Sequence, residues 1–112
     1  QYELARAYYV WLCNNCVYDE GTVSSSSLSH LAYSALVDGV AVCDGYTGAY
    51  DLLLRLEGIE CTALMNTDHI WTVAELDGKT YHIDTTWGDQ GTRVDMSFFG
   101  MTEAQSRAKH AW

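Results

Sequence analysis

The chain has 112 residues, contains no proline and carries a formal net charge of −9, from six Lys and Arg against fifteen Asp and Glu. Apolar residues make up 48% of it, which is typical of a folded domain and excludes an intrinsically disordered segment. The acidic balance repels phosphate backbones, and no apolar run approaches the ~20 residues of a membrane-spanning helix, so we expect neither nucleic-acid binding nor membrane insertion.

A chain of this size buries roughly two-thirds of its unfolded surface, enough for one core, so we predict a single domain over residues 1–112. The sequence opens at Gln1 rather than Met and stops inside the helical pattern "TEAQSRAKHAW". We therefore expect the domain to be a fragment of a longer protein.

The first predicted element is an amphipathic helix over residues 2–17, because Leu4, Tyr8, Leu12 and Cys16 recur at every fourth position. The pair "CNNC", Cys13 and Cys16, lies late in this helix. A zinc site would need a second pair of ligands at suitable spacing, and a redox dithiol normally opens a helix after a strand. Packing in the core is the favoured interpretation of the pair, with structural zinc as the alternative.

Two more helices follow. The polar run "DEGTVSSSS" ends the first helix, and its last serines are good N-caps for a short helix over "LSHLAYSALVD", residues 28–38, which Gly39 ends. A third helix is predicted over residues 44–57, with an apolar stripe that includes Tyr46 and with Gly58 as its end.

Three strands are expected after the helices. They are read from "IECTALM" (59–65), "HIWTVAEL" (69–76) and "KTYHIDTTW" (79–87), and Asp77-Gly78 is a strong signal for a two-residue hairpin turn between the last two. This order predicts an α+β fold with helices packed on one side of a small antiparallel sheet.

Cys43 stands where the third helix starts. The positive end of a helix dipole and the unpaired N–H groups there favour a thiolate and can also hold an oxyanion. Cysteine is also among the most buried residue types, so structural packing is the alternative. A cysteine nucleophile requires a histidine base, which in turn requires a carboxylate that fixes its tautomer.

The hairpin register indicates where these partners lie. If Leu76 pairs with Lys79, then His69 and Asp84 form a diagonal pair on one face of the sheet, roughly 7–8 Å apart at the backbone. A single bulge would reverse the faces. His82 falls on the same face, but its position in the middle of a strand favours a structural hydrogen bond, so His69 is the preferred base.

Three aromatic residues are candidates for substrate binding: Tyr46, Trp71 and Trp87. The two tryptophans could line a substrate groove beside the histidine. Large aromatic side chains on a short sheet more often belong to the core, and that alternative stays open for both.

Three separated motifs carry a family resemblance. The segments "VCDGYTGAYDLLLRLEGIE", "HIW" and "LDGKTYHIDTTWGD" resemble the transglutaminase-like superfamily, its bacterial branch in particular, over roughly residues 9–100. The order of cysteine, His-x-Trp and Asp-Thr-Thr-Trp is the feature that they share.

The resemblance implies a papain-like core with a catalytic cysteine at the N-terminus of the central helix. It assigns Cys43 as the nucleophile, His69 as the base and Asp84 as the residue that orients the base, with no cofactor and no metal. In place of the Trp-containing cysteine motif of the animal crosslinking enzymes this chain has "VCDGY", and it is too short for their calcium sites.

We therefore predict cysteine-dependent acyl transfer on the amide bonds of a peptide or protein substrate, through a thioester and with hydrolysis favoured over crosslinking. The alternative is a non-catalytic peptide- or glycan-binding assembly module of a bacterial surface protein. The resemblance to the bacterial branch of the superfamily implies an extracellular or cell-surface location. The sequence predicts no oligomeric state.

Overall fold

A computed structural model of the chain describes residues 1–18, 40–41, 43–66, 69–90 and 93–110. The short helix predicted over residues 28–38 lies outside these ranges. The described elements, in chain order, are α1 (Tyr2–Asn15), β1 (Val17–Tyr18), β2 (Val40–Ala41), α2 (Cys43–Leu56), β3 (Cys61–Met65), β4 (Ile70–Leu76), β5 (Lys79–Ile83), α3 (Thr85–Gly88), the 3-10 helix η3 (Met96–Phe98) and α4 (Glu103–His110).

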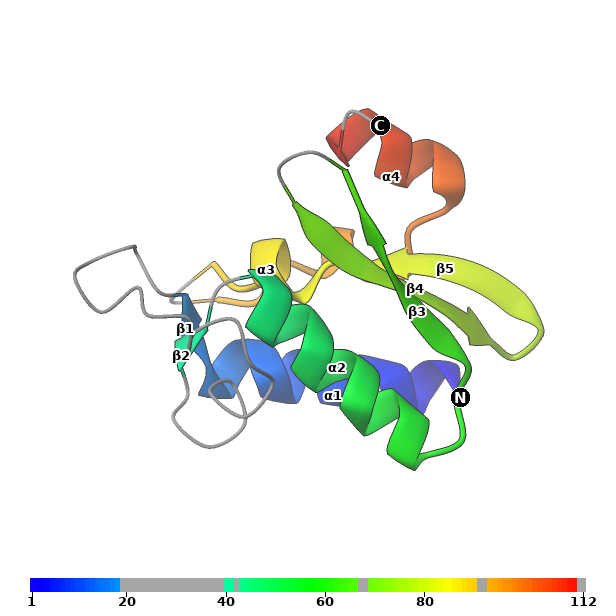
Figure 1. Cartoon of the computed structure of the whole chain (residues 1–112), viewed down its shortest axis with the longest axis horizontal. Helices are drawn as coiled ribbons and strands as arrows, with labels where there is room; N and C mark the ends of the chain where they lie inside the picture. Colours follow the sequence, from blue (N-terminus) through cyan, green and yellow to red (C-terminus); the bar gives the residue numbers. More distant parts are fainter. Residues whose placement is uncertain (19–39, 42, 67–68, 91–92, 111–112) are drawn as a thin grey trace.

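The main sheet has three antiparallel strands in the order β3-β4-β5, and α1 and α2 pack together against one of its faces (Figure 1). The terminal helix α4 lies against the opposite face, where His110 stacks on Trp71 of β4. The short strands β1 and β2 pair in parallel and form a second, two-stranded sheet. The predicted α+β architecture is confirmed.

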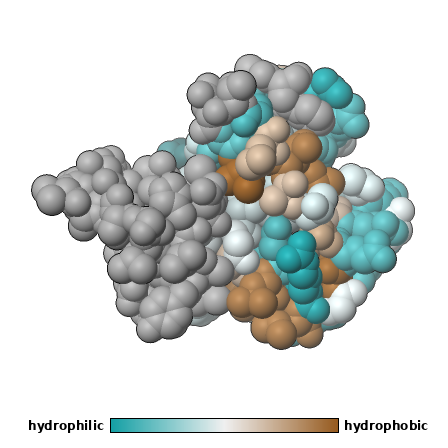
Figure 2. Space-filling model, in the orientation of Figure 1, coloured by the Kyte–Doolittle hydropathy of each residue, from teal (hydrophilic) through white to brown (hydrophobic). Residues whose placement is uncertain are grey.

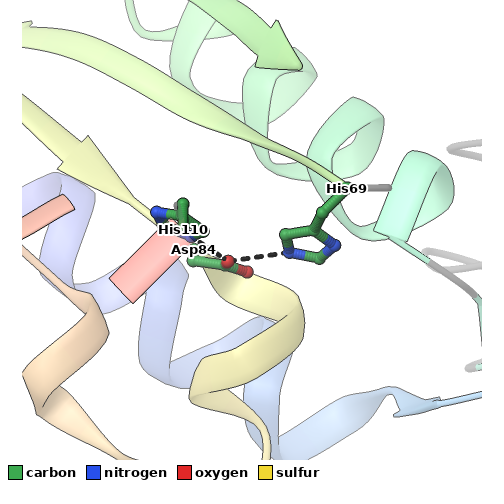
Figure 3. Close-up of side chains that lie close together, drawn as sticks. All are labelled: His69, Asp84 and His110. Atoms are coloured by element: carbon green, nitrogen blue, oxygen red, sulfur yellow. Dashed lines mark hydrogen bonds and ion pairs between the residues drawn. The ribbon is translucent and has the colours of Figure 1, made fainter. Parts of the chain in front are cut away.

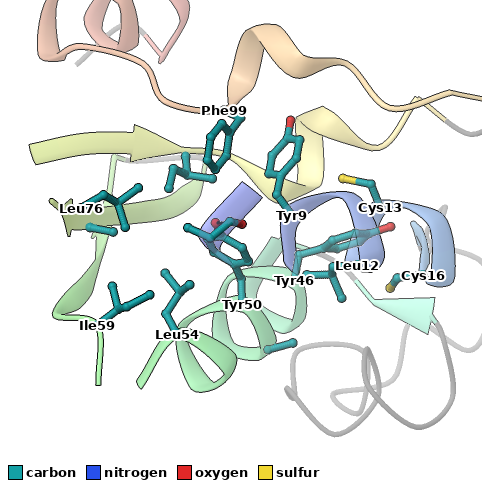
Figure 4. Packing of buried hydrophobic residues seen from close by; sticks show 14 residues of the cluster. Tyr9, Leu12, Cys13, Cys16, Tyr46, Tyr50, Leu54, Ile59, Leu76 and Phe99 are labelled. Atoms are coloured by element: carbon teal, nitrogen blue, oxygen red, sulfur yellow. Dashed lines mark hydrogen bonds between the residues drawn. The ribbon is translucent and has the colours of Figure 1, made fainter. Parts of the chain in front are cut away.

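The core lies between α1, α2 and the sheet and is rich in tyrosine (Figure 4). Tyr9 and Tyr50 are fully buried, and the Tyr50 hydroxyl donates to the carbonyl of Ala5 at 2.8 Å, which ties α2 to α1. Cys13 and Cys16 are buried in the same cluster, as the packing interpretation predicted.

Three predicted helix boundaries shift slightly in the structure. Helix α1 ends at Asn15 rather than at residue 17, because Cys16 adopts an extended backbone and the next two residues pair with β2. Helix α2 starts at Cys43 and ends at Leu56, one residue earlier at each end than predicted.

The β4-β5 hairpin has the predicted register. Asp77 and Gly78 both have positive φ, 52° and 84°, as a tight two-residue turn requires. Leu76 therefore pairs with Lys79, and His82 lies opposite Val73. The register that placed His69 and Asp84 on one face is confirmed.

The last strand is shorter than predicted. The run "KTYHIDTTW" was expected to be extended through Trp87, but β5 ends at Ile83 and α3 begins at Thr85. Asp84 causes this change of direction, because its side chain accepts the backbone N–H of Trp87 at 3.0 Å and caps the new helix.

The outer surface carries only separated apolar areas on the face shown in Figure 2, with polar residues between them. The exposed large apolar side chains include Leu52 and Leu56 on α2 and Met65 at the end of β3. Among the helices of the described ranges, none combines the length and the apolar character needed to cross a bilayer.

Gly88, the last residue of α3, lies against the Tyr9 ring of α1. A Cβ at this position would lie 1.8 Å from the Tyr9 hydroxyl oxygen and 2.4 Å from Cζ. We expect Gly88→Ala to destabilise the fold by about 3 kcal/mol, because Tyr9 must move and lose its hydrogen bond to the Asp95 carbonyl. Urea denaturation followed by circular dichroism measures the change.

The same substitution in a Tyr9→Phe background is the matched control. Removing the hydroxyl relieves the closest clash but leaves the ring in place, so the cost of Gly88→Ala should fall by about 1 kcal/mol. An unchanged cost in the two backgrounds would show that the contact with Tyr9 is not its cause.

Candidate active site

The carboxylate of Asp84 is the centre of the candidate site (Figure 3). Its Oδ2 lies 2.8 Å from Nε2 of His69 and 2.8 Å from Nε2 of His110, while Oδ1 accepts the Trp87 backbone N–H. The predicted hydrogen bond between His69 and Asp84 is confirmed, and the structure adds His110 to the pair.

Asp84 is ionised although it is only 1% exposed. Burial alone would raise its pKa, but the hydrogen bonds from His110 and His69 outweigh that effect and hold the pKa of Asp84 below its usual value. A carboxylate in this state accepts an N–H from each imidazole, which places a proton on Nε2 of each ring.

His69 is fixed at the start of β4 by Asn66. The Asn66 side-chain oxygen accepts the His69 backbone N–H at 2.8 Å, and the Asn66 N–H donates to the His69 carbonyl at 3.0 Å. These bonds fix the backbone of His69, and the contacts of its imidazole with Asp84 and Trp87 fix the direction of the side chain. Figure 3 shows that its second nitrogen, Nδ1, points away from the Asp84 carboxylate.

The start of α2 lies beside His69. Thr47, one helical turn after Cys43, donates its hydroxyl to the carbonyl of Ile70, the residue next to His69, at 3.2 Å. Cys43 is the first residue of α2, as a helix-start nucleophile requires. Its side chain lies outside the described part of the structure, so its pairing with His69 stays a prediction.

Both imidazoles stack on tryptophan rings. His110 lies 3.8 Å from Trp71 and 4.7 Å from Trp87, and His69 lies 4.4 Å from Trp87, measured between ring centroids. The interplanar angles in these three pairs are 4°, 18° and 8°. The stack fixes the planes of both rings and shields their hydrogen bonds to Asp84 from water.

The three aromatic candidates for substrate binding lie in different environments. Trp71 and Tyr46 are fully buried, which corresponds to the core alternative, and the Tyr46 hydroxyl donates to Asp89 Oδ2 at 2.6 Å. Trp87 is partly exposed and stacks on His69. Trp87 is therefore the member of this set that a substrate at His69 could touch.

His82 lies on the same face but in a different role. Its Nδ1 accepts the indole N–H of Trp71 at 3.1 Å, and burial lowers its pKa, so the ring is held neutral. This agrees with the structural role predicted for His82.

Burial makes two of the other described thiols, Cys13 and Cys61, less acidic than a free cysteine. Burial raises the pKa of Cys13, whose Sγ lies 3.5 Å from the Thr85 carbonyl, and it raises the pKa of Cys61 to about 11. Both are therefore poor nucleophiles at neutral pH.

A groove of about 570 Å³ lies elsewhere on the molecule, between the end of α2 and strands β3 and β4. Arg55, Cys61 and Glu75 are among its lining residues, whereas neither His69 nor Asp84 lines it. The groove is separate from the candidate active site.

His110 is a site residue that no pattern in the sequence indicated. It follows Asp84 by 26 residues and lies at the end of α4, with a side chain that is fully buried. The helical pattern of "TEAQSRAKHAW" predicted its element, but no spacing connected it to Asp84.

The sequence model of the transglutaminase-like superfamily matches the chain over residues 1–112. The chain belongs to this superfamily. Of the residues singled out from the sequence, Cys43 starts α2 and His69 is hydrogen-bonded to Asp84.

Similar mammalian proteins carry a peptidase name. The chain is 25% identical over 103 residues to the mouse protein "Kyphoscoliosis peptidase" and 24% identical to its human counterpart. Each match covers 77% of this chain but only 16% of the relative, so the chain spans about a sixth of the length of these curated proteins.

Two solved structures share the fold. One, described as a TGase, superimposes with a TM-score of 0.63 at 18% identity and covers 78% of this chain and 26% of its own. The other, a candidate cysteine protease from Cytophaga hutchinsonii, has a TM-score of 0.56 at 21% identity and covers 73% of this chain and 30% of its own. The transglutaminase-like fold of this chain is thereby established.

Two substitutions at Asp84 should differ in their effect on stability. Asp84→Ala leaves two imidazoles and the Trp87 N–H without their acceptor and should cost about 3–5 kcal/mol. Asp84→Asn keeps an oxygen for Trp87 and presents an amide to both rings, so it should cost only about 1–2 kcal/mol. Denaturation at pH 8 measures both; equal costs would contradict this network.

Proposed function

We propose that this chain is a cysteine-dependent acyl-transfer domain that attacks amide bonds of a peptide or protein, with Cys43 as nucleophile, His69 as base and Asp84 as the residue that orients the base. The observation that carries the proposal is the 2.8 Å contact between His69 Nε2 and Asp84 beside the start of α2. Membership of the transglutaminase-like superfamily supports it.

Asp84 determines which nitrogen of His69 acts as the base. Because the ionised carboxylate holds the His69 proton on Nε2, the proton-accepting nitrogen is Nδ1, which points away from Asp84 (Figure 3). In the proposed reaction Nδ1 takes the proton of the Cys43 thiol. Asp84 then stabilises the resulting imidazolium.

The helix start at Cys43 serves the next two steps. The thiolate attacks the amide carbonyl, and the N–H groups of the first turn of α2 stabilise both the thiolate and the oxyanion of the tetrahedral intermediate. The His69 imidazolium gives its proton to the leaving amine, which leaves a thioester on Cys43. Water, deprotonated by His69, then hydrolyses the thioester.

Hydrolysis is the proposed outcome rather than crosslinking. The same thioester yields an isopeptide bond if a lysine amine replaces water, so the catalytic residues alone do not distinguish the two reactions. The peptidase name of the mouse and human relatives supports hydrolysis, although each of those proteins extends far beyond the segment that matches.

Selective alkylation tests the role of Cys43. A thiolate that shares a proton with His69 has a pKa below the usual value of about 8.5, so iodoacetamide at pH 7 should modify Cys43 fastest. Cys61, whose pKa burial raises to about 11, is the internal control in the same sample. Peptide mapping by mass spectrometry gives both rates, and an amide-mimicking electrophile should be trapped on Cys43.

His69→Ala distinguishes a catalytic thiol from a merely accessible one. The variant should slow the alkylation of Cys43 at pH 7 but much less at pH 9.5, where the thiol ionises without a base. If Cys43 is alkylated no faster than Cys61, and if its alkylation rate is the same in the wild type and in His69→Ala, the proposal is wrong. The peptide- or glycan-binding module then replaces it.

Asp84→Asn should preserve the fold while lowering the rate of amide hydrolysis by about 10³–10⁴-fold. The Trp87 N–H requires the amide oxygen, so the amide N–H₂ faces His69 and moves the imidazole proton from Nε2 to Nδ1. A nitrogen that carries a proton cannot accept one. A variant with near-normal turnover would contradict the assigned role of Asp84.

A further inference from the structure

We propose that His69, Asp84 and His110 form a binding site for one transition-metal cation of the zinc class, and that its occupation switches off the proposed base. No metal was expected here from the sequence, and no sequence pattern pointed to this cluster, because only the fold brings His110 to Asp84. Their ligand atoms, two Nε2 and one carboxylate oxygen, all lie within 4.8 Å of one another.

The geometry of the cluster is close to that of a metal site. Each Nε2 lies 2.8 Å from Asp84 Oδ2, whereas ligand atoms around a tetrahedral zinc ion are separated by about 3.3 Å. A small outward movement of the two rings would make room for the ion. Two imidazoles and one carboxylate favour zinc, nickel or copper over magnesium or calcium, and three protein ligands leave a position for water.

The hydrogen-bond partners of the ligand side chains are also typical of a metal site. The Trp87 N–H holds Asp84 Oδ1, and Nδ1 of His110 lies 3.0 Å from the Ser106 carbonyl. When a metal takes Nε2 of a neutral imidazole, the ring proton moves to Nδ1, and in His110 the Ser106 carbonyl is placed to accept it.

Access to the site is through His69. Its side chain is 10% exposed, whereas those of Asp84 and His110 are 1% and 0% exposed. A cation therefore reaches the cluster past the same ring that the proposed reaction uses.

Occupation would inactivate His69 by a change of tautomer. With its Nε2 on the metal, His69 carries its proton on Nδ1 and cannot take a proton from Cys43. This regulatory consequence depends on the proposed function, whereas binding of the metal itself does not. Metal binding and the inactivation of His69 can therefore be disproved separately.

The test measures binding of Zn²⁺ and Co²⁺ directly in the 112-residue chain, by calorimetry and by the visible absorption of Co²⁺. We expect one equivalent to bind in the wild type and equally in Cys43→Ala, which lacks the nucleophile. His69→Gln and His110→Gln should each weaken binding about a hundredfold. The double variant Cys13→Ala/Cys16→Ala, which removes the thiols of the "CNNC" pair, is the matched control and should bind normally.

A ¹⁵N NMR titration with Zn²⁺ keeps the test decisive if His110→Gln does not fold. Zinc should shift the Nε2 resonances of His69 and His110 in the wild type. Absence of binding, binding that survives His69→Gln, or binding lost with the cysteine pair would overturn the site. If zinc binds as expected but leaves Cys43 alkylation at pH 7 unchanged, the switch is wrong and the metal site stands.

Discussion

The buried negative charge of Asp84 is the constraint on which the rest of the site depends. Removing a carboxylate from water costs several kcal/mol unless donors replace the lost hydration. Here the donors come from three elements: the backbone of α3 at Trp87, His69 at the start of β4 and His110 at the end of α4. The hairpin register, the turn into α3 and the docking of α4 are therefore linked through one side chain.

The structural and chemical roles of Asp84 coincide because its two oxygens have different partners. Oδ1 caps α3, and Oδ2 receives both imidazoles. The cap fixes the carboxylate plane, and that plane fixes the direction from which His69 approaches. His82 has no such role although it lies on the same sheet face, since its Nδ1 already accepts the Trp71 indole.

The sequence predicted those parts that local rules determine. Asp77 and Gly78 specify a tight turn, the turn specifies the register, and the register places His69 with Asp84. The end of β5 could not be predicted, because the threonines after Asp84 favour a strand and the capping hydrogen bond that overrides them is visible only in three dimensions. The contact of His110 with Asp84 could not be predicted for a different reason. Helical periodicity places a residue on a helix but does not say where that helix docks.

The distance along the chain between Asp84 and His110 has a consequence for biosynthesis. The two residues are 26 positions apart, so at ribosomal rates of 5–20 residues per second about 1–5 s separate their synthesis. During that interval the hairpin and α3 can form, but the carboxylate still lacks one of its imidazole donors. The nascent chain thus carries an incompletely compensated charge until α4 has left the ribosome, so the docking of α4 follows the synthesis of the hairpin that it completes.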